Sequence, residues 1–101
     1  MKDIITLKPS QRGKGLRFII SRAIREGEDI QFGDTLQINI YGFFKEGRDM
    51  ILIEPSIPMP SIVSKIGTNT QGVTMKRNIV KLLNLEEEQM LAVDIIKKKD
   101  V

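Results

Sequence analysis

Basic side chains gathered in two acid-free runs give this sequence its clearest capacity for chemistry. The first run extends from residue 8 to residue 25 and holds Lys8, Arg12, Lys14, Arg17, Arg22 and Arg25. The second extends from residue 65 to residue 81 and holds Lys65, Lys76, Arg77 and Lys81. Each run is followed by acids, four in residues 26–34 and four in residues 86–94. Because the same polarity occurs twice, the sequence favours a basic face that meets an anion over separately solvated charges.

Groups for catalysis are scarce. The chain has no histidine and no cysteine, so it lacks the commonest general base, the commonest metal ligand and a thiolate nucleophile. Among the acids and hydroxyls that could converge, Asp34 is better explained by a turn and Asp94 by an outward strand position, which leaves Ser21 and Ser64. The loop PSQRGKG (9–15) matches neither common nucleotide-binding glycine pattern. We therefore expect no enzyme, no cofactor and no metal site.

Composition predicts one soluble domain. The chain has 101 residues, of which 41% are hydrophobic and 29% charged, and a formal net charge of +3. No apolar run approaches the roughly 18 residues that a membrane span needs, and the N-terminus lacks the apolar core of a signal peptide. These features predict a cytoplasmic protein with no membrane partner.

Hydrophobic alternation and turn residues predict the elements that position these cations. Strands are expected at residues 4–7, 16–20, 35–41 and 50–53, and again at 62–66, 73–75 and 90–96. A helix capped by Ser21 should end near Gly27, and a second helix should span 77–83 with Ile79, Leu82 and Leu83 facing the core. Residues 42–49 are expected to form a hairpin connection. Residues 55–60, PSIPMP, have three prolines and predict a stiff, extended linker.

The chain resembles itself at a shift of roughly 55 residues. This shift places Phe18 on Val73 and Leu36 on Leu91, with further apolar matches between. We expect two half-repeats, 1–54 and 61–101, joined by the linker 55–60. Neither half is long enough to bury its own apolar face, so the two should share one core within a single domain, 1–101.

A family resemblance rests on two motifs. GTNTQGVTMKRNIVKLLNL resembles the pattern GNSLGVTIPKEIAKALGL of AbrB-like and MazE-like (SpoVT-AbrB) swapped-hairpin DNA-binding proteins, and IQFGDTLQINI resembles their IKPGDxVEVEI segment. The resemblance implies a mainly β fold with short helices, a small barrel made from two βαβ-type repeats, here in tandem in one chain. A double-psi β-barrel is the alternative strand pairing. The family's helix-opening proline is replaced by Ser21 and Lys76, and its Gly-Asp turn by Glu88-Gln89 in the second repeat.

For function, the resemblance implies a sequence-specific transcriptional regulator that binds double-stranded DNA through basic loops and helix starts. Carried over to this chain, the DNA-binding residues are Lys8, Arg12, Lys14, Arg17, Arg22, Arg25, Lys65, Asn69, Lys76, Arg77 and Lys81. Arginine can pair with guanine through two hydrogen bonds and asparagine with adenine, whereas lysine mostly contacts phosphates. The loop TNTQ of the second repeat is uncharged, so the first repeat is expected to supply more affinity and the pair to read an imperfect palindrome.

Protein binding is the alternative function. The chain could be the antitoxin of a toxin–antitoxin pair, although only about five residues follow Ile96 where such antitoxins carry a long tail. The second repeat lacks the returning strand 50–53 of the first, and the free edge together with the small core favours a homodimer. Tyr41, Phe43 and Phe44 are expected to cover the core rather than to stack on single-stranded bases.

Overall fold

The computed structural model describes residues 1–10, 15–45, 49–66 and 70–98. Its elements, in chain order, are β1 (Lys2–Thr6), β2 (Lys8–Pro9), β3 (Leu16–Ile19), α1 (Arg22–Gly27), β4 (Thr35–Phe44), β5 (Met50–Ile62), β6 (Ser64–Ile66), β7 (Thr70–Thr74), α2 (Arg77–Leu83) and β8 (Met90–Lys97). The prediction of a mainly β chain with short helices is therefore confirmed.

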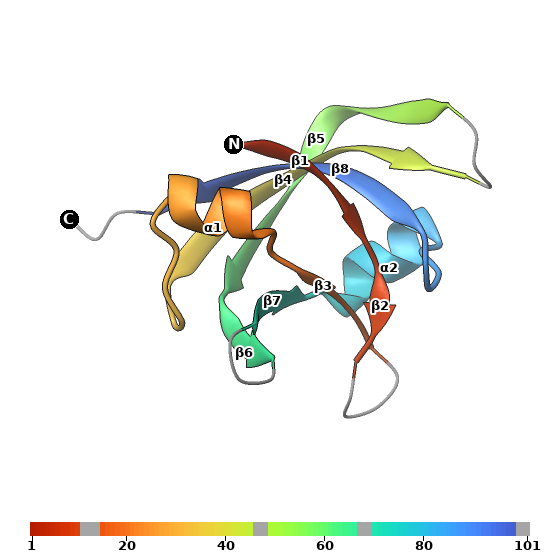
Figure 1. Cartoon of the computed structure of the whole chain (residues 1–101). Coiled ribbons are helices and arrows are strands. Elements are labelled where there is room, and N and C mark those ends of the chain that lie inside the picture. The colour runs from red at the N-terminus through yellow and green to blue at the C-terminus, as the bar shows by residue number, and fades with distance from the viewer. Residues whose placement is uncertain (11–14, 46–48, 67–69, 99–101) are drawn as a thin grey trace.

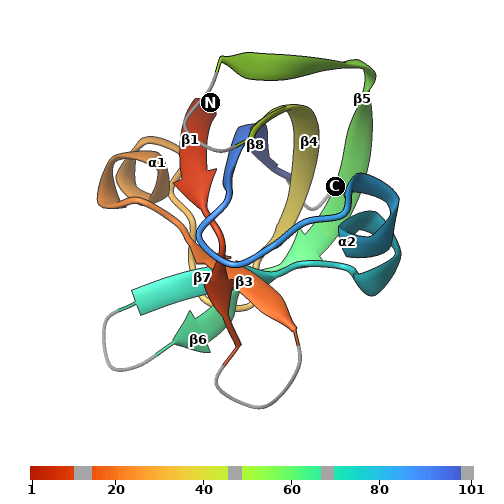
Figure 2. The same cartoon turned by 90° about the vertical axis from the view of Figure 1, so that its right-hand side faces the viewer.

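Two antiparallel sheets make up the fold. One has the strand order β1-β8-β4-β5 and the other β2-β3-β7-β6. The strands on either side of each helix lie in different sheets, because α1 connects β3 to β4 and α2 connects β7 to β8. Figure 1 shows the two helices on opposite flanks of the molecule, and Figure 2 shows the β3-β7 pair crossing beneath β4 and β8.

The core is formed by side chains from both sheets. Phe18 and Val73 contribute from the second sheet, and Ile38 and Ile95 from the first, all of them fully buried. No polar or charged residue in the described part of the chain is buried. Since burying one such side chain contributes roughly 1.5–3 kcal/mol, this continuous apolar cluster supplies most of the driving force for folding.

The two halves exchange their first strands. β1 pairs with β8 of the second half, and the segment 57–62 of β5, which corresponds to β1 at a shift of 55 or 56 residues, pairs with β4 of the first half. Residues 55 positions apart face each other at the centre of each sheet: Phe18 lies opposite Val73, and Asn39 lies opposite Asp94. The chain therefore has an approximate twofold relation between its halves.

Backbone hydrogen bonds follow the same relation. The N–H of Val63 donates to the Asp34 carbonyl at 2.9 Å, and the N–H of Gly33 donates to the Val63 carbonyl at 3.0 Å. In the other half, Leu7 makes the matching bonds to the backbone at residues 89 and 88, at 2.9 and 2.8 Å. The repeated turns thus hold the exchanged strands in the same way.

The proline-rich segment 55–60 is part of a strand. It is extended, as its prolines require, but β5 continues through it, and 57–60 pair with β4 instead of joining two separate halves. Val63 directs its N–H and carbonyl toward residues 33 and 34, so alternation directs Pro58 and Pro60 to the outer edge of the sheet. Proline lacks a backbone N–H, and at an outward position none is needed for pairing with β4, which explains why the strand tolerates it. Pro58 and Pro60 also leave this part of the edge without donors for another strand.

Other differences from the sequence predictions are local. Ile79 is buried and Leu83 packs on the core, but Leu82 is 71% exposed, because in a two-turn helix the buried face passes through 79 and 83 and excludes 82. β4 extends through Phe43 and Phe44 into the expected hairpin connection, since both pair with the apolar start of β5. The predicted cap is confirmed: Ser21 Oγ accepts a hydrogen bond from the N–H of Ile24 at 3.3 Å.

β8 has a neighbour on each side, β1 and β4, so the missing strand of the second half leaves no open edge at β8. The edges of this sheet are β1 and β5. On β1 the outward N–H of Ile4 is already bonded to Asp3 Oδ1 at 2.9 Å. One of the two sequence-based reasons for a homodimer, a free edge left by the missing strand, is thus absent, and the homodimer stays a prediction.

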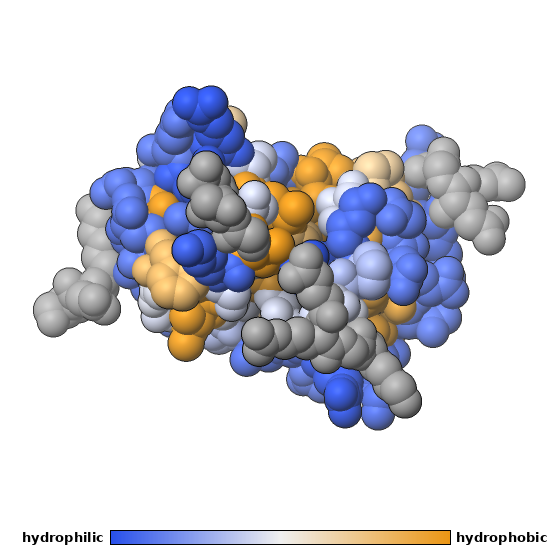
Figure 3. All heavy atoms as spheres, turned by 60° about the horizontal axis from the view of Figure 1, so that its bottom comes forward, coloured by the Kyte–Doolittle hydropathy of each residue, from blue (hydrophilic) through white to orange (hydrophobic). Residues whose placement is uncertain are grey.

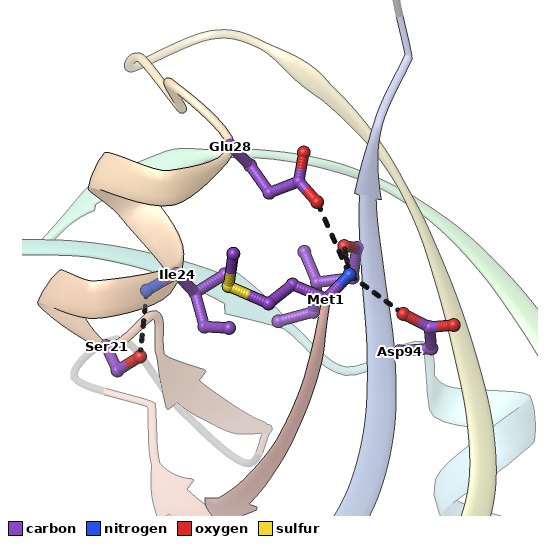
Figure 4. Close-up of polar contacts among 6 residues, drawn as sticks. Met1, Ser21, Ile24, Glu28 and Asp94 are labelled. Carbon is purple, nitrogen blue, oxygen red and sulfur yellow. Dashed lines mark hydrogen bonds and ion pairs between the residues drawn. The ribbon is translucent and has the colours of Figure 1, made fainter.

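The Met1 amine fastens β1 to the rest of the sheet. It donates to Asp94 Oδ1 at 2.9 Å, to Glu28 Oε1 at 3.3 Å and to the Ile95 carbonyl at 2.7 Å, and its side chain reaches toward α1 (Figure 4). Burial lowers the pKa of this amine, but the hydrogen bonds to Asp94 and Glu28 raise it by more, so the net pKa lies above its ordinary value.

Candidate nucleic-acid interface

The predicted binding residues that the structure describes lie on the second sheet and on the two helices. Lys8 is on β2, Arg17 on β3 and Lys65 on β6. Arg22 and Arg25 are on α1, Lys76 is the N-cap of α2, and Arg77 and Lys81 are within α2. Arg12, Lys14 and Asn69 lie outside the described residues. The helix cations therefore divide between two flanks of the molecule.

Three described cations of the first half, Lys8, Arg22 and Arg25, are engaged with other groups. Lys8 Nζ bonds both carboxylate oxygens of Glu88, at 3.0 and 2.8 Å. Arg22 Nε donates to Glu26 Oε1 at 2.9 Å, one turn along α1. Arg25 is half-buried in the last turn and makes an interaction of its own. An incoming anion must compete with these groups, although exposed ion pairs of this kind contribute only about 0–1 kcal/mol.

The cations of the second half have a different setting. Lys65, Lys76, Arg77 and Lys81 are exposed, and none of them has a carboxylate within ion-pair distance in the described part of the chain. Lys76 and Arg77 begin α2, where the helix has unsatisfied N–H groups and no side-chain cap. Both features favour negative charge at this end of the helix.

Two grooves occupy related places in the two halves. Groove one, about 280 Å³, is lined by Asp3, Ile4, Ile5, Thr6, Lys8, Ile19 and Ser21. Groove two, about 450 Å³, is lined by Thr35, Pro60, Ser61, Ile62, Ser64, Thr74 and Lys76. Six positions of each groove correspond at a shift of 55 or 56 residues, so the grooves are the same place in the two halves.

The two grooves differ in charge. Groove one has a cation, Lys8, that is paired with Glu88, and it also has an acid, Asp3. Groove two has Lys76 and no acid among its lining residues. It also joins a neighbouring hollow of about 580 Å³, which shares Ile62, Ser64 and Thr74 with it. Groove two is thus the more electropositive of the pair.

This face is mixed in character. In Figure 3, which brings the second sheet forward, orange hydrophobic atoms lie among blue hydrophilic ones. Phe32 and Ile62, 63% and 65% exposed, contribute apolar surface beside groove two. Sequence reasoning missed Phe32, Ile62 and Thr74, and it considered Ser64 only as a candidate catalytic hydroxyl. Thr74 was recoverable, because it alternates with buried Val73 and Met75, whereas the others depend on where the exchanged strand and its turn pack.

Other classes of site receive no support from the described residues. They contain no group of three or more acidic side chains placed to hold a metal ion. In the same part of the chain, neither helix is long and apolar enough to cross a bilayer. Comparisons of the chain with protein-family models, curated proteins and solved structures found no match.

Proposed function

We propose that this chain is a sequence-specific transcriptional regulator that binds double-stranded DNA, with the swapped-hairpin arrangement that its motifs suggest. The observation that carries the proposal is the cluster of unpaired cations at the start and outer side of α2, Lys76, Arg77 and Lys81, beside groove two. Lysine and arginine without a carboxylate partner are the groups that displace counterions from DNA phosphates.

The strand exchange between the halves supports the fold part of the proposal. In a swapped arrangement each half contributes its first strand to the other half, as β1 and residues 57–62 of β5 do. The described strands form two four-stranded sheets and no closed barrel, so the barrel and the choice between swapped-hairpin and double-psi pairing belong to the proposal. The order β1-β8-β4-β5 in an entirely antiparallel sheet favours the swapped-hairpin arrangement, because parallel pairings are absent from the described strands.

The size of the molecule bounds the DNA site. Its longest extent is 35 Å, which is close to the roughly 34 Å of one turn of B-DNA. We therefore propose a site of about ten base pairs. Because the two halves present different side chains at related positions, the site is an imperfect palindrome. Because Lys8 and Arg22 are engaged in ion pairs, we expect the second half to supply more of the affinity, the reverse of the expectation from loop charge.

A matched pair of double variants tests the proposal. Binding to a mixed duplex pool is measured by fluorescence anisotropy at two salt concentrations for Arg77→Gln/Lys81→Gln and for Lys8→Gln/Arg22→Gln, which each remove two charges. We expect the α2 variant to lose about tenfold in affinity and its log–log salt slope to become shallower by about 2, since each phosphate contributes about −0.9. The Lys8→Gln/Arg22→Gln variant should lose less affinity.

Absence of DNA binding by the unaltered chain at low salt contradicts the proposal. Equal losses of affinity in the two variants contradict the larger contribution assigned to α2.

A protein partner is the second candidate, favoured by one observation. Met50 and Leu52, which share one face at the start of β5, are 40% and 54% exposed, on a hairpin that extends beyond the rest of the sheet (Figure 1). Exposed apolar groups that adjoin one another mark contact surfaces. An antitoxin role requires a toxin that co-purifies stably with the chain and is released by Leu52→Lys. Purification of the chain alone, with DNA binding intact, favours the regulator.

A further inference from the structure

Arg17 has an uncompensated charge. It extends from the outer side of β3, is half-buried, and has no hydrogen bond or ion pair to the rest of the described chain. Its Nε is inaccessible to solvent and has no hydrogen-bond partner. A partly buried cation without a counter-charge is costly, and a lone orphaned donor in a folded protein commonly indicates a missing ligand or ion.

The surroundings of Arg17 suit an anion. It lines the hollow of about 580 Å³ beside groove two, together with Lys65 and the hydroxyls of Ser10, Ser64 and Thr74. None of the residues that line this hollow is acidic. Two cations and several hydroxyl donors around one space, without an internal carboxylate, make a site that lacks only its negative partner.

The arginine of this hollow has no counterpart in the other half. Arg17 corresponds to Gly72 in the other half, where a Cβ atom would lie 2.8 Å from the carbonyl oxygen of Phe18 and collide with Ile66. No arginine can occupy that place without moving the backbone. The approximate twofold relation therefore does not duplicate the Arg17 position.

We propose that this hollow binds a phosphoryl group, with the Arg17 guanidinium and the Lys65 ammonium supplying the charge and the hydroxyls donating hydrogen bonds. A guanidinium matches two phosphate oxygens at once, whereas an ammonium contributes a point charge. Phe32 and Ile62 at the rim offer apolar surface to the organic part of the ligand. The phosphoryl group comes from the DNA backbone, in which case the site rests on the proposed function, or from a free phosphorylated small molecule.

Inorganic phosphate is the probe for the chemistry. The thermal midpoint is followed as phosphate replaces chloride at constant ionic strength, for the unaltered chain, Arg17→Met and the control Lys45→Met, whose lysine lies away from the hollow at the end of β4. We expect a saturable rise in the unaltered chain and in the control, and none in Arg17→Met. Without phosphate, Arg17→Met should be as stable as the unaltered chain or more so, which verifies folding. If the thermal midpoint does not rise when phosphate replaces chloride, or rises equally in Arg17→Met, the proposed site is wrong.

DNA binding by Arg17→Met distinguishes the two sources. If the DNA backbone supplies the phosphate, affinity falls about tenfold on all duplexes alike, and phosphate displaces DNA at constant ionic strength. If the ligand is a free phosphorylated molecule, DNA affinity is unchanged while the phosphate-dependent rise disappears. A chain that binds phosphate but no DNA keeps the site and loses the proposed function, so the two failures are separable.

Discussion

Groove one and groove two are built from the same backbone and carry different side chains. The register of the exchanged strands and the turns that hold them agree at a shift of 55 or 56 residues. At the lining positions, however, Lys8 corresponds to Ser64 and Ser21 to Lys76. Hydrogen-bond register and core packing keep the backbone the same in both halves. Neither of them constrains which side chains occupy the exposed positions. The comparison teaches that a repeated framework need not give a repeated site.

The strongest test of the shared framework concerns the pair at its centre. Phe18 and Val73 are both fully buried and face each other across β3 and β7. Phe18→Ala should destabilise the chain by about 3–5 kcal/mol because it removes a large side chain and leaves a cavity. Val73→Ala removes fewer atoms and should cost less. Urea unfolding measures both, and a Phe18→Ala cost below about 1 kcal/mol contradicts a single shared core.

The two equivalent turns, at Gly33 and Glu88, share a left-handed backbone conformation but carry different residues. Gly33 has φ +88° and its counterpart Glu88 has φ +68°. Gly33→Ala should cost about 1–2 kcal/mol, since a side chain is disfavoured in this left-handed region. Glu88→Gly removes that strain and the exposed pair with Lys8, so we expect a gain of up to about 1 kcal/mol. Thermal or urea unfolding is the measurement; destabilisation by Glu88→Gly shows that the ion pair matters more than the strain.

The helix starts differ by one cap. Ser21 caps α1 through its hydroxyl, whereas Lys76 makes no side-chain cap of α2. Ser21→Ala should cost about 1 kcal/mol, and Lys76→Ser should stabilise the chain by a similar or smaller amount. If Lys76 is kept for anion binding, Lys76→Ser also weakens DNA binding while Ser21→Ala leaves it intact. A variant that gains stability and keeps full DNA affinity removes Lys76 from the site.

The smallest expected effects depend on pH. The pKa of the Met1 amine is raised, so its contribution is present below its ordinary value of about 8 and is lost as pH rises through the raised value. The pKa of Asp34 is lowered, first by the Gln31 N–H and then by Lys97, so its contribution is present above the ordinary value of about 4 and is lost as pH falls. Urea midpoints across pH should decline at both ends. Asp94→Asn should weaken the alkaline decline, and an unchanged alkaline profile in that variant contradicts the role of the amine.

Much of the local structure was predictable from sequence. The helix 77–83, the cap at Ser21 and the central strand from residue 35 follow from periodicity, capping chemistry and clean alternation. The predicted element boundaries were wrong where strand pairing sets them. Three prolines indicated an extended linker at 55–60, and the segment is extended but lies within β5. An edge strand tolerates proline when the missing N–H faces outward, and that requires knowing which strand is at the edge.

The sequence by itself determined which residues are charged, which alternate and which repeat, because these depend only on residue type and spacing. The tertiary structure decided which charges remain available. Lys8 and Glu88 are 80 positions apart and meet only because β1 and β2 lie beside the last turn of the other half. Arg17 has no partner among the described residues, in a hollow bordered by residues from three distant segments. Neutralised and uncompensated cations look alike in a sequence, because the difference between them is a long-range contact.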